Sequence, residues 1–93
     1  DLMNLNGWHI FTKWCLASKN EENLSSLLDL LLTQEEKESI SSRCLIIMEL
    51  LKHEKTQRDI ASHLNVSIAK ITRGSNELKR TPSSVIDFLK ENL

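Results

Sequence analysis

Apolar side chains recur along this chain at spacings of three and four residues, which is the period of one face of an α-helix. Polar breaks divide the pattern, and the sequence contains no alternating apolar and polar run typical of a strand. The segments predicted to be helical are about 7–18, about 20–32, 34 to about 51, two short helices within 56–76, and about 81 to the last residue. The sequence therefore predicts an all-α fold, and its 93 residues predict a single domain over 1–93.

Residues 56–76 have the pattern of two short helices joined by a tight turn. Ile60 and Leu64 lie one turn apart on one face of the first helix. Asn65 follows, and Asn is the best non-glycine residue for the left-handed conformation that ends a helix, while Ser67 can cap the second helix. This pattern is typical of a helix-turn-helix, whose second helix can enter the major groove of DNA. The alternative is an ordinary helical hairpin.

The net charge of −1 is unevenly distributed along the chain. Residues 1–51 carry four Lys and Arg against eight acids, whereas residues 52–80 carry seven against three, a local charge of +4. A basic segment of this size is enough to bind DNA phosphates, and the acidic residues 1–51 limit non-specific binding to DNA. The charge distribution therefore favours the helix-turn-helix interpretation.

Leucines point in almost every direction around the predicted helix over residues 24–32. A helix that is apolar on most faces must be buried on most faces, and a chain of this length buries only a thin core. We therefore expect an interlocked homodimer. Trp8 and Trp14 share the first predicted helix, where they indicate core or dimer-interface anchors rather than a ligand platform.

Cys15 and Cys44 fall within apolar helical patterns, with no Cys-x-x-Cys motif and no histidine at zinc-site spacing. We expect two reduced core thiols, no metal site and a cytoplasmic protein without a signal peptide or membrane span. An enzyme is the least favoured class, because no nucleophile or carboxylate stands at a useful spacing from the three histidines.

The run Ile71-Thr72-Arg73-Gly74-Ser75-Asn76, preceded by Thr56-Gln57-Arg58, resembles the tryptophan repressor family. The similarity continues upstream without gaps through residues 27–33, Arg43 and Glu49-Leu50-Leu51, and is strong over 27–79. The resemblance implies an intertwined all-helical homodimer with six helices per subunit. It also implies that L-tryptophan acts as a corepressor, enabling binding to a palindromic operator of tryptophan supply genes.

The resemblance further implies a corepressor pocket whose chemistry suits tryptophan. Arg43 and Arg73 can hold the indole between planar guanidinium groups, and Arg73 can reach the carboxylate. The end of the helix at residues 30–32, contributed by the other subunit, can accept hydrogen bonds from the ammonium group. The implied corepressor residues are Leu30, Leu32, Thr33, Arg43, Ile47, Arg73 and Gly74. Without the resemblance, a surface ion pair for Arg43 and a phosphate contact for Arg73 are the simpler interpretations.

The same resemblance implies a DNA-binding face. Arg58 matches a position near base edges, residues 68–70 stand at the front of the recognition helix, and the other polar residues suit phosphate contacts. The implied DNA-binding residues are Lys55, Gln57, Arg58, Ile68, Ala69, Lys70, Thr72, Arg73, Ser75, Asn76 and Lys79. Lys70 departs from the small hydroxyl residue common in the family, and Glu77 replaces a small serine near the ligand's ammonium.

These observations leave three functional hypotheses. The first is a tryptophan-dependent repressor that binds DNA as a homodimer. The second is a helix-turn-helix regulator gated by another ligand or by none, which Lys70 and Glu77 keep open. The third is a small helical interaction module without DNA, against which the basic segment argues.

Overall fold

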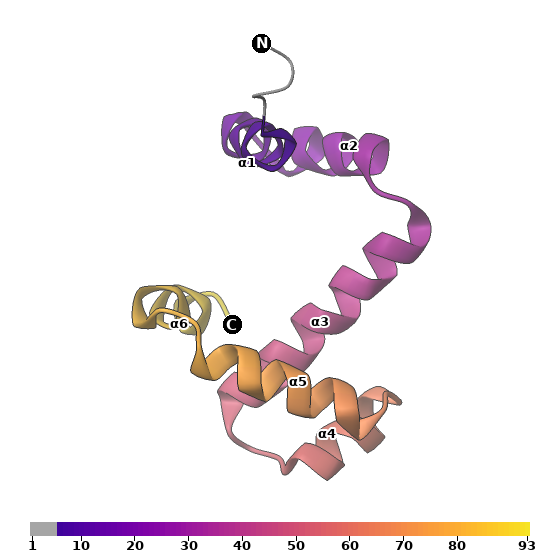
Figure 1. The fold of residues 1–93 in the computed structure, drawn as a ribbon, viewed down its shortest axis with the longest axis vertical. Coiled ribbons are helices and arrows are strands. Elements are labelled where there is room, and N and C mark those ends of the chain that lie inside the picture. Colours follow the sequence, from indigo (N-terminus) through magenta and orange to yellow (C-terminus); the bar gives the residue numbers. More distant parts are fainter. Residues whose placement is uncertain (1–5) are drawn as a thin grey trace. The chain divides into compact units, whose positions relative to one another are not determined.

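The computed structural model describes residues 6–93, and these residues form six α-helices (Figure 1). The helices are α1 (Gly7–Ala17), α2 (Glu21–Leu31), α3 (Gln34–Lys52), α4 (Gln57–Leu64), α5 (Ile68–Lys79) and α6 (Ser83–Glu91). The predictions of an all-α fold and of six helices are confirmed. The chain divides into two compact units, with the boundary between Glu36 and Lys37 in the first turn of α3. Within the described residues, no helix is long and apolar enough to cross a membrane.

Polar side chains begin the first three helices by accepting hydrogen bonds from unpaired backbone N–H groups. The side chain of Asn6 accepts from Trp8 N–H at 3.0 Å, and that of Asn20 accepts from Asn23 N–H at 2.8 Å. The reciprocal pair before α3 is a capping box: Glu36 N–H donates to Thr33 Oγ1 at 3.1 Å, and Thr33 N–H donates to Glu36 Oε1 at 2.9 Å. The bond from the Thr33 N–H also holds the pKa of Glu36 below its ordinary value.

The helix-turn-helix has the local structure that its sequence predicts. Thr56 Oγ1 accepts from Asp59 N–H at 3.1 Å and begins α4, and Ser67 Oγ accepts from Lys70 N–H at 3.4 Å and begins α5. Asn65 has φ 56° and ψ 47°, the left-handed conformation that ends α4. These three residues fix the turn without any glycine.

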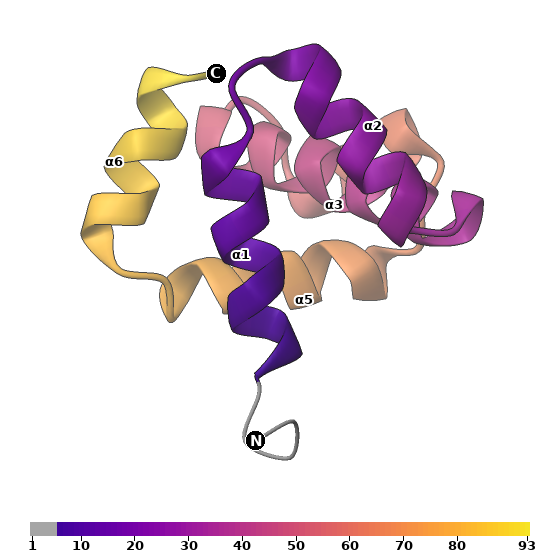
Figure 2. The ribbon, with the colours of Figure 1, turned by 90° about the horizontal axis from the view of Figure 1, so that it is seen from above.

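The core of the second unit joins α3 to the two helices of the helix-turn-helix (Figure 1, Figure 2). Ile60 of α4 and Ile71 of α5 are completely buried, and they cluster with Ile46 of α3 and with Ala61. Leu50, Leu64 and Val66 pack around this cluster. Burial of the three isoleucines, each contributing on the order of 2 kcal/mol, holds α4 and α5 on α3.

The first unit exposes large apolar side chains. Neither α1 nor α2 contains a buried residue, and Trp8 and Leu30 are 72% and 79% exposed. Trp8 is thus not a core residue of the single chain, and of the two predicted roles, core or dimer-interface anchor, the second stays a prediction. Trp14 is exposed as well. Cys44, expected to be a core thiol, is exposed because the buried stripe of α3 runs along another face of that helix.

Candidate ligand pocket and nucleic-acid interface

A cavity of about 420 Å³ lies between α3 and α5 in the second unit. Its lining residues recur every three or four positions on each helix, as expected for two facing helical stripes. They are Ser39, Ser42, Arg43, Ile46 and Ile47 of α3 and Lys70, Arg73, Gly74 and Glu77 of α5. The volume lies within the usual range for small-molecule sites, about 300–1,000 Å³.

Gly74 lies where α5 packs tightly against side chains of α3. A Cβ atom at this position would lie 3.0 Å from Ile46 Cγ2 and 3.4 Å from Leu50 Cδ1. The missing side chain therefore allows α5 to contact α3 directly at one edge of the cavity. Gly74 was predicted as a corepressor residue, and its packing role between α3 and α5 is additional to that prediction.

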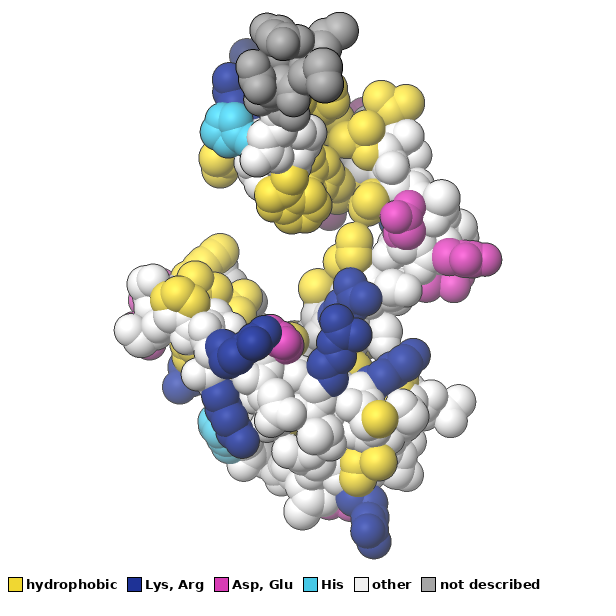
Figure 3. All heavy atoms as spheres, in the orientation of Figure 1, with side chains coloured by type: hydrophobic (Ala, Val, Ile, Leu, Met, Phe, Trp, Pro, Cys, Tyr) yellow, Lys and Arg dark blue, Asp and Glu magenta, His cyan; other side chains and the backbone are white. Residues whose placement is uncertain are grey.

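The cavity is predominantly cationic. Arg43, Lys70 and Arg73 line it, and Figure 3 shows dark-blue Lys and Arg side chains gathered on the face that carries α3 and α5. Within the described residues no ion pair engages these three side chains. Such a lining, with apolar Ile46 and Ile47 beside it, suits a ligand that is both flat and anionic.

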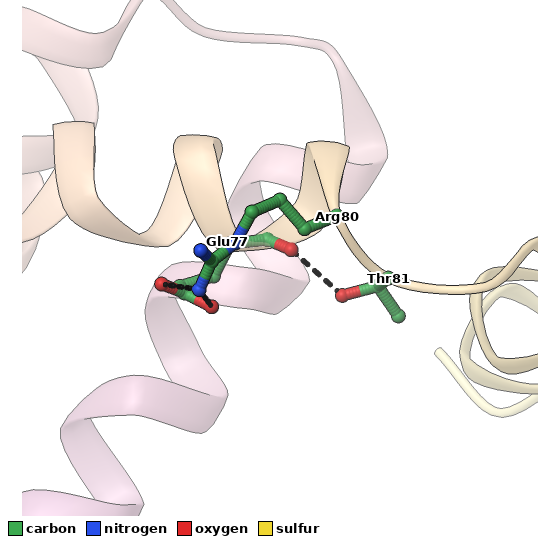
Figure 4. Close-up of polar contacts among 3 residues, drawn as sticks. All are labelled: Glu77, Arg80 and Thr81. Atoms are coloured by element: carbon green, nitrogen blue, oxygen red, sulfur yellow. Dashed lines mark hydrogen bonds and ion pairs between the residues drawn. The ribbon is translucent and has the colours of Figure 1, made fainter.

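Glu77 is the acidic residue of the lining, and it is held by a neighbour on its own helix (Figure 4). Arg80 Nη2 donates to both carboxylate oxygens of Glu77, at 2.8 and 2.9 Å. The hydroxyl of Thr81 donates to the backbone carbonyl of Glu77 at 2.8 Å. The carboxylate therefore lies at the C-terminal end of α5 with a single charged partner in the described part of the chain.

Four of the predicted corepressor residues come together in this cavity: Arg43, Ile47, Arg73 and Gly74. Leu30, Leu32 and Thr33 belong to the other unit, at the end of α2 and in its connection to α3. The sequence analysis missed Ser39, Ser42 and Ile46 as lining residues. Ser39 and Ile46 lie four and three residues from Arg43 along α3, and this helical spacing was the signal that could have found them, whereas Ser42 is the direct neighbour of Arg43.

The end of α2 offers backbone acceptors, as the sequence suggested. Leu32 caps the helix, and its N–H donates to the Leu28 carbonyl at 2.8 Å. The carbonyl groups of Leu30 and Leu31 are among those that the helix itself leaves without a partner, since the last four carbonyls of any α-helix lack one. The Thr33 hydroxyl already accepts the Glu36 N–H, but it retains its own proton for donation.

The front of α5 is open to solvent. Ile68 is 48% exposed, and Ala69 and Lys70 beside it are also exposed. Arg58 is exposed on α4, and Asn76 and Lys79 are exposed further along α5, whereas Ser75 is half-buried. An exposed isoleucine at the start of a recognition helix suits apolar contact with bases in a major groove.

Three of the predicted phosphate contacts already have partners inside the protein. The Thr72 hydroxyl lies 3.2 Å from Gln57 Oε1 and 3.1 Å from the Ile68 carbonyl, so it can donate to either. The bond to Gln57 ties α5 to the first turn of α4. Lys55 Nζ lies 2.8 Å from Glu49 Oε2.

Glu49 is the buried acid of this unit, with 8% of its surface exposed. Its hydrogen bond from Lys55 holds the pKa of Glu49 below the ordinary glutamate value, and Lys52, at 3.6 Å, and His63 act in the same direction. The same bond raises the pKa of Lys55. The pair anchors the connection between α3 and α4, in which His53 adopts a left-handed φ of 55°.

Acidification is expected to remove the stabilisation supplied by Glu49. Its folded-state pKa lies below the unfolded value of about 4.3, so its contribution is present above that pH and is lost as the pH falls through the folded-state pKa. Thermal melts at about pH 7 and about pH 3 should show a large deficit for Glu49→Gln only at the higher pH. Glu91→Gln, an exposed control, should melt like the wild type at both. A Glu49→Gln deficit independent of pH would contradict this account.

Comparison with known proteins agrees with this geometry. The family described as Trp repressor protein matches residues 6–93, which include every helix, the cavity and the helix-turn-helix. The chain belongs to the Trp repressor family. It is 46% identical to the Trp operon repressor homolog of Chlamydia caviae, over 94% of this chain and 86% of that protein. The homologs of Chlamydia trachomatis serovar D and Pasteurella multocida are 41% and 38% identical, over 94% and 97% of this chain and 93% and 88% of their own lengths.

The Trp repressor family is a family of tryptophan-responsive transcriptional repressors that bind DNA, a class of regulators and not of enzymes. The resemblance drawn from residues 27–79 is thus confirmed and extends over nearly the whole chain. In this member, the two departures noted from sequence, Lys70 and Glu77, both line the cavity beside Arg73.

Proposed function

We propose that the chain is an L-tryptophan-dependent repressor that binds a palindromic operator of tryptophan supply genes as a homodimer. The observation that carries the proposal is that Arg43 and Arg73, from two different helices, line one cavity with Ile47. Two guanidinium planes suit the faces of an indole, and either can bind its carboxylate. L-Tryptophan acts as a ligand here, and no other cofactor is needed.

The proposed gating depends on Arg73, because α5 carries both this cavity residue and the exposed front at Ile68. Without a ligand, Arg43 and Arg73 repel each other, and α5 lacks a packing surface on that side. A bound indole separates the two charges and fixes the position of α5. Ligand binding then favours the spacing at which two recognition helices meet successive major grooves, about 34 Å apart.

The proposed homodimer follows from the exposed apolar surface of the first unit. The side chains of Trp8, Trp14, Leu16 and Leu30 are more than half exposed, and a second copy would cover them. In this arrangement the α2 end of the partner subunit, with Leu30, Leu32 and Thr33, completes the ammonium side of the pocket. Residues 1–93 would then act as one domain within the dimer, in the bacterial cytoplasm.

We expect an obligate dimer, since folding and association would bury the same apolar side chains. Sedimentation velocity at micromolar concentration should give the mass of two chains, with no folded monomer on dilution. A folded monomer at that concentration would contradict the dimer.

A second candidate is a helix-turn-helix regulator gated by another ligand or by none. It is favoured by Lys70 and Glu77, which change the charge of the cavity lining. Calorimetric titration with L-tryptophan, together with operator affinity measured with and without it, separates the candidates. The proposed function requires saturable binding and an operator affinity that rises with ligand, and the second candidate replaces it if neither occurs.

The proposed DNA face places Arg58 at base edges and residues 68–70 in the major groove. The proposed phosphate contacts are Lys55, Gln57, Thr72, Ser75, Asn76 and Lys79, and the guanidinium of Arg73 reaches both the ligand and the DNA side. Of these, Lys55, Gln57 and Thr72 also fix the helix-turn-helix internally, so their substitution affects folding as well as DNA binding.

Lys70→Thr is expected to reduce the salt dependence of operator binding. Each phosphate neutralised by a cation contributes about 0.9 to the slope of log affinity against log salt, so the slope should fall by about one unit per subunit. Fluorescence anisotropy of labelled operator across a salt series measures it. Lys90→Thr, which removes another exposed charge, from α6, serves as the control. An unchanged slope would place Lys70 away from the phosphates.

A further inference from the structure

One hydrogen bond between side chains joins the two helices of the helix-turn-helix. The Thr72 hydroxyl, in the second turn of α5, lies 3.2 Å from Gln57 Oε1, in the first turn of α4. The two helices lie side by side (Figure 1), and no other hydrogen bond between side chains links them in the described part of the chain. Thr72 is exposed and Gln57 is half-buried, so the bond lies at the surface of the proposed DNA face.

This bond decides which end of the Gln57 amide faces outwards. An amide has one oxygen that accepts hydrogen bonds and one NH2 group that donates them. With Oε1 towards Thr72, the NH2 group points away from Thr72. Among the residues that the structure describes, the Gln57 side chain makes no other hydrogen bond. Its NH2 group is therefore available to an acceptor outside the chain.

The Thr72 hydroxyl has one proton and two acceptors within reach, Gln57 Oε1 at 3.2 Å and the Ile68 carbonyl at 3.1 Å. If the proton goes to Ile68, the Thr72 oxygen only accepts, and the Gln57 amide must turn over to donate to it. The outward end of the amide is then its oxygen, which a phosphate repels. A phosphate beside α4 therefore favours the arrangement in which Thr72 donates to Gln57.

The outward amide lies beside other donors at the start of α4. Gln57 and Arg58 are the first two residues of this helix, and their backbone N–H groups have no acceptor within it. These donors and the positive end of the helix dipole suit a phosphate. Arg58 is the exposed residue proposed for base edges, so a phosphate bound beside it would fix its position on the duplex.

We propose that Thr72 is a positioning residue that holds the Gln57 amide with its NH2 group towards a phosphate of the DNA backbone. This role specifies how the two residues take part in the proposed phosphate contacts: Gln57 makes the contact, and Thr72 orients it. It requires the DNA-binding face of the proposed function and is independent of which ligand fills the cavity.

A double-mutant cycle of Thr72→Val and Gln57→Ala in the full chain tests this role. Valine keeps the shape and the β-branch of threonine and removes the hydroxyl. Fluorescence anisotropy gives the affinity for a labelled duplex that the wild-type protein has selected from a randomised pool in the presence of L-tryptophan. We expect Thr72→Val to weaken binding about tenfold, because both subunits must then order an unrestrained side chain on binding. In the Gln57→Ala background, Thr72→Val should have no further effect.

Two conservative variants and one control accompany the cycle. Thr72→Ser keeps the hydroxyl and should bind within about twofold of the wild type. Gln57→Glu still accepts from Thr72 but presents a negative oxygen in place of the NH2 group, so it should bind more weakly than Gln57→Ala. Thr12→Val removes a hydroxyl from α1, where it donates to the His9 carbonyl at 2.9 Å, and should leave the DNA affinity unchanged.

A series of duplexes, each with one phosphate replaced by a neutral methylphosphonate, separates positioning from a general effect on folding. The wild type should lose affinity when the phosphate bound by Gln57 is replaced. Gln57→Ala should be insensitive at that phosphate, and Thr72→Val should be less sensitive there and nowhere else. A loss in Thr72→Val that is equal for every duplex of the series would show a general structural effect and overturn the positioning role.

Three other results would also overturn it. They are no loss of DNA affinity in Thr72→Val, an equal loss from Thr72→Val with and without Gln57, which makes Thr72 a direct phosphate contact, and Gln57→Glu binding as well as Gln57→Ala. The proposed function fails separately. If the wild-type affinity for the duplex is the same with and without L-tryptophan, the gating is wrong, while the cycle still measures the coupling between Thr72 and Gln57.

Discussion

Arg73→Lys is expected to weaken L-tryptophan binding by about ten- to a hundredfold and, through it, operator binding in the presence of the ligand. The variant keeps the positive charge in the cavity but loses the planar guanidinium that can cover an indole face and bind a carboxylate with two hydrogen bonds. A desolvated cation–π contact contributes up to about 2 kcal/mol, and loss of the second hydrogen bond adds to this. Calorimetry measures the first effect, and anisotropy with labelled operator measures the second.

The matched control for this prediction is Arg80→Lys. It makes the same substitution seven residues further along the chain, at a residue that is exposed, does not line the cavity and can still pair with Glu77. L-Tryptophan affinity should remain within about twofold of the wild type, as for other surface substitutions. If Arg73→Lys binds L-tryptophan as the wild type does, the indole does not stack on Arg73, and the proposed gating fails.

Arg58→Ala is expected to reduce specific operator affinity by about a hundredfold while leaving L-tryptophan affinity unchanged. Arg58 is exposed on α4 and does not line the cavity, so its loss should affect only DNA. A bidentate arginine–guanine contact contributes about 1–3 kcal/mol of base discrimination, and a homodimer makes it twice. Affinity for an unrelated duplex should fall much less, because that binding depends mainly on phosphate contacts.

Lys90→Ala is the control for Arg58→Ala, since it removes one exposed positive charge from α6. It should change operator affinity only slightly. An equal loss for operator and unrelated DNA in Arg58→Ala would make Arg58 a phosphate contact. A simultaneous loss of L-tryptophan affinity would mean that the substitution disturbs α5 through the packing of α4.

Ligand and DNA binding must also be coupled in both directions. If L-tryptophan raises operator affinity by some factor, operator DNA raises L-tryptophan affinity by the same factor. Arg73→Lys should therefore lower the affinity for L-tryptophan and, through the coupling, the operator affinity measured with the ligand present. Arg58→Ala should lower the operator affinity alone.

The sequence by itself determined the helices and the structures that begin and end them. The cap at Ser67 and the left-handed Asn65 form as predicted, and the Thr33–Glu36 capping box and the cap at Thr56 come from local patterns of the same kind. Each depends on groups within about four residues, so the information is local. The basic segment and the family motif likewise come from neighbouring residues, which is why the family could be identified before the fold was known.

Only the tertiary structure decided which of these residues meet. Ser39 and Ser42 line the cavity because α5 lies against α3. Gly74 permits this close packing, since a Cβ atom at that position would lie only 3.0 Å from Ile46 Cγ2. Three predicted phosphate contacts have partners inside the protein: Lys55 binds Glu49, and Thr72 and Gln57 bind each other. The Thr72–Gln57 contact links residues 15 positions apart. Helical periodicity tells which face a side chain occupies, but it does not tell which face of another helix will lie opposite. That is settled by the burial of Ile46, Ile60 and Ile71 in one core.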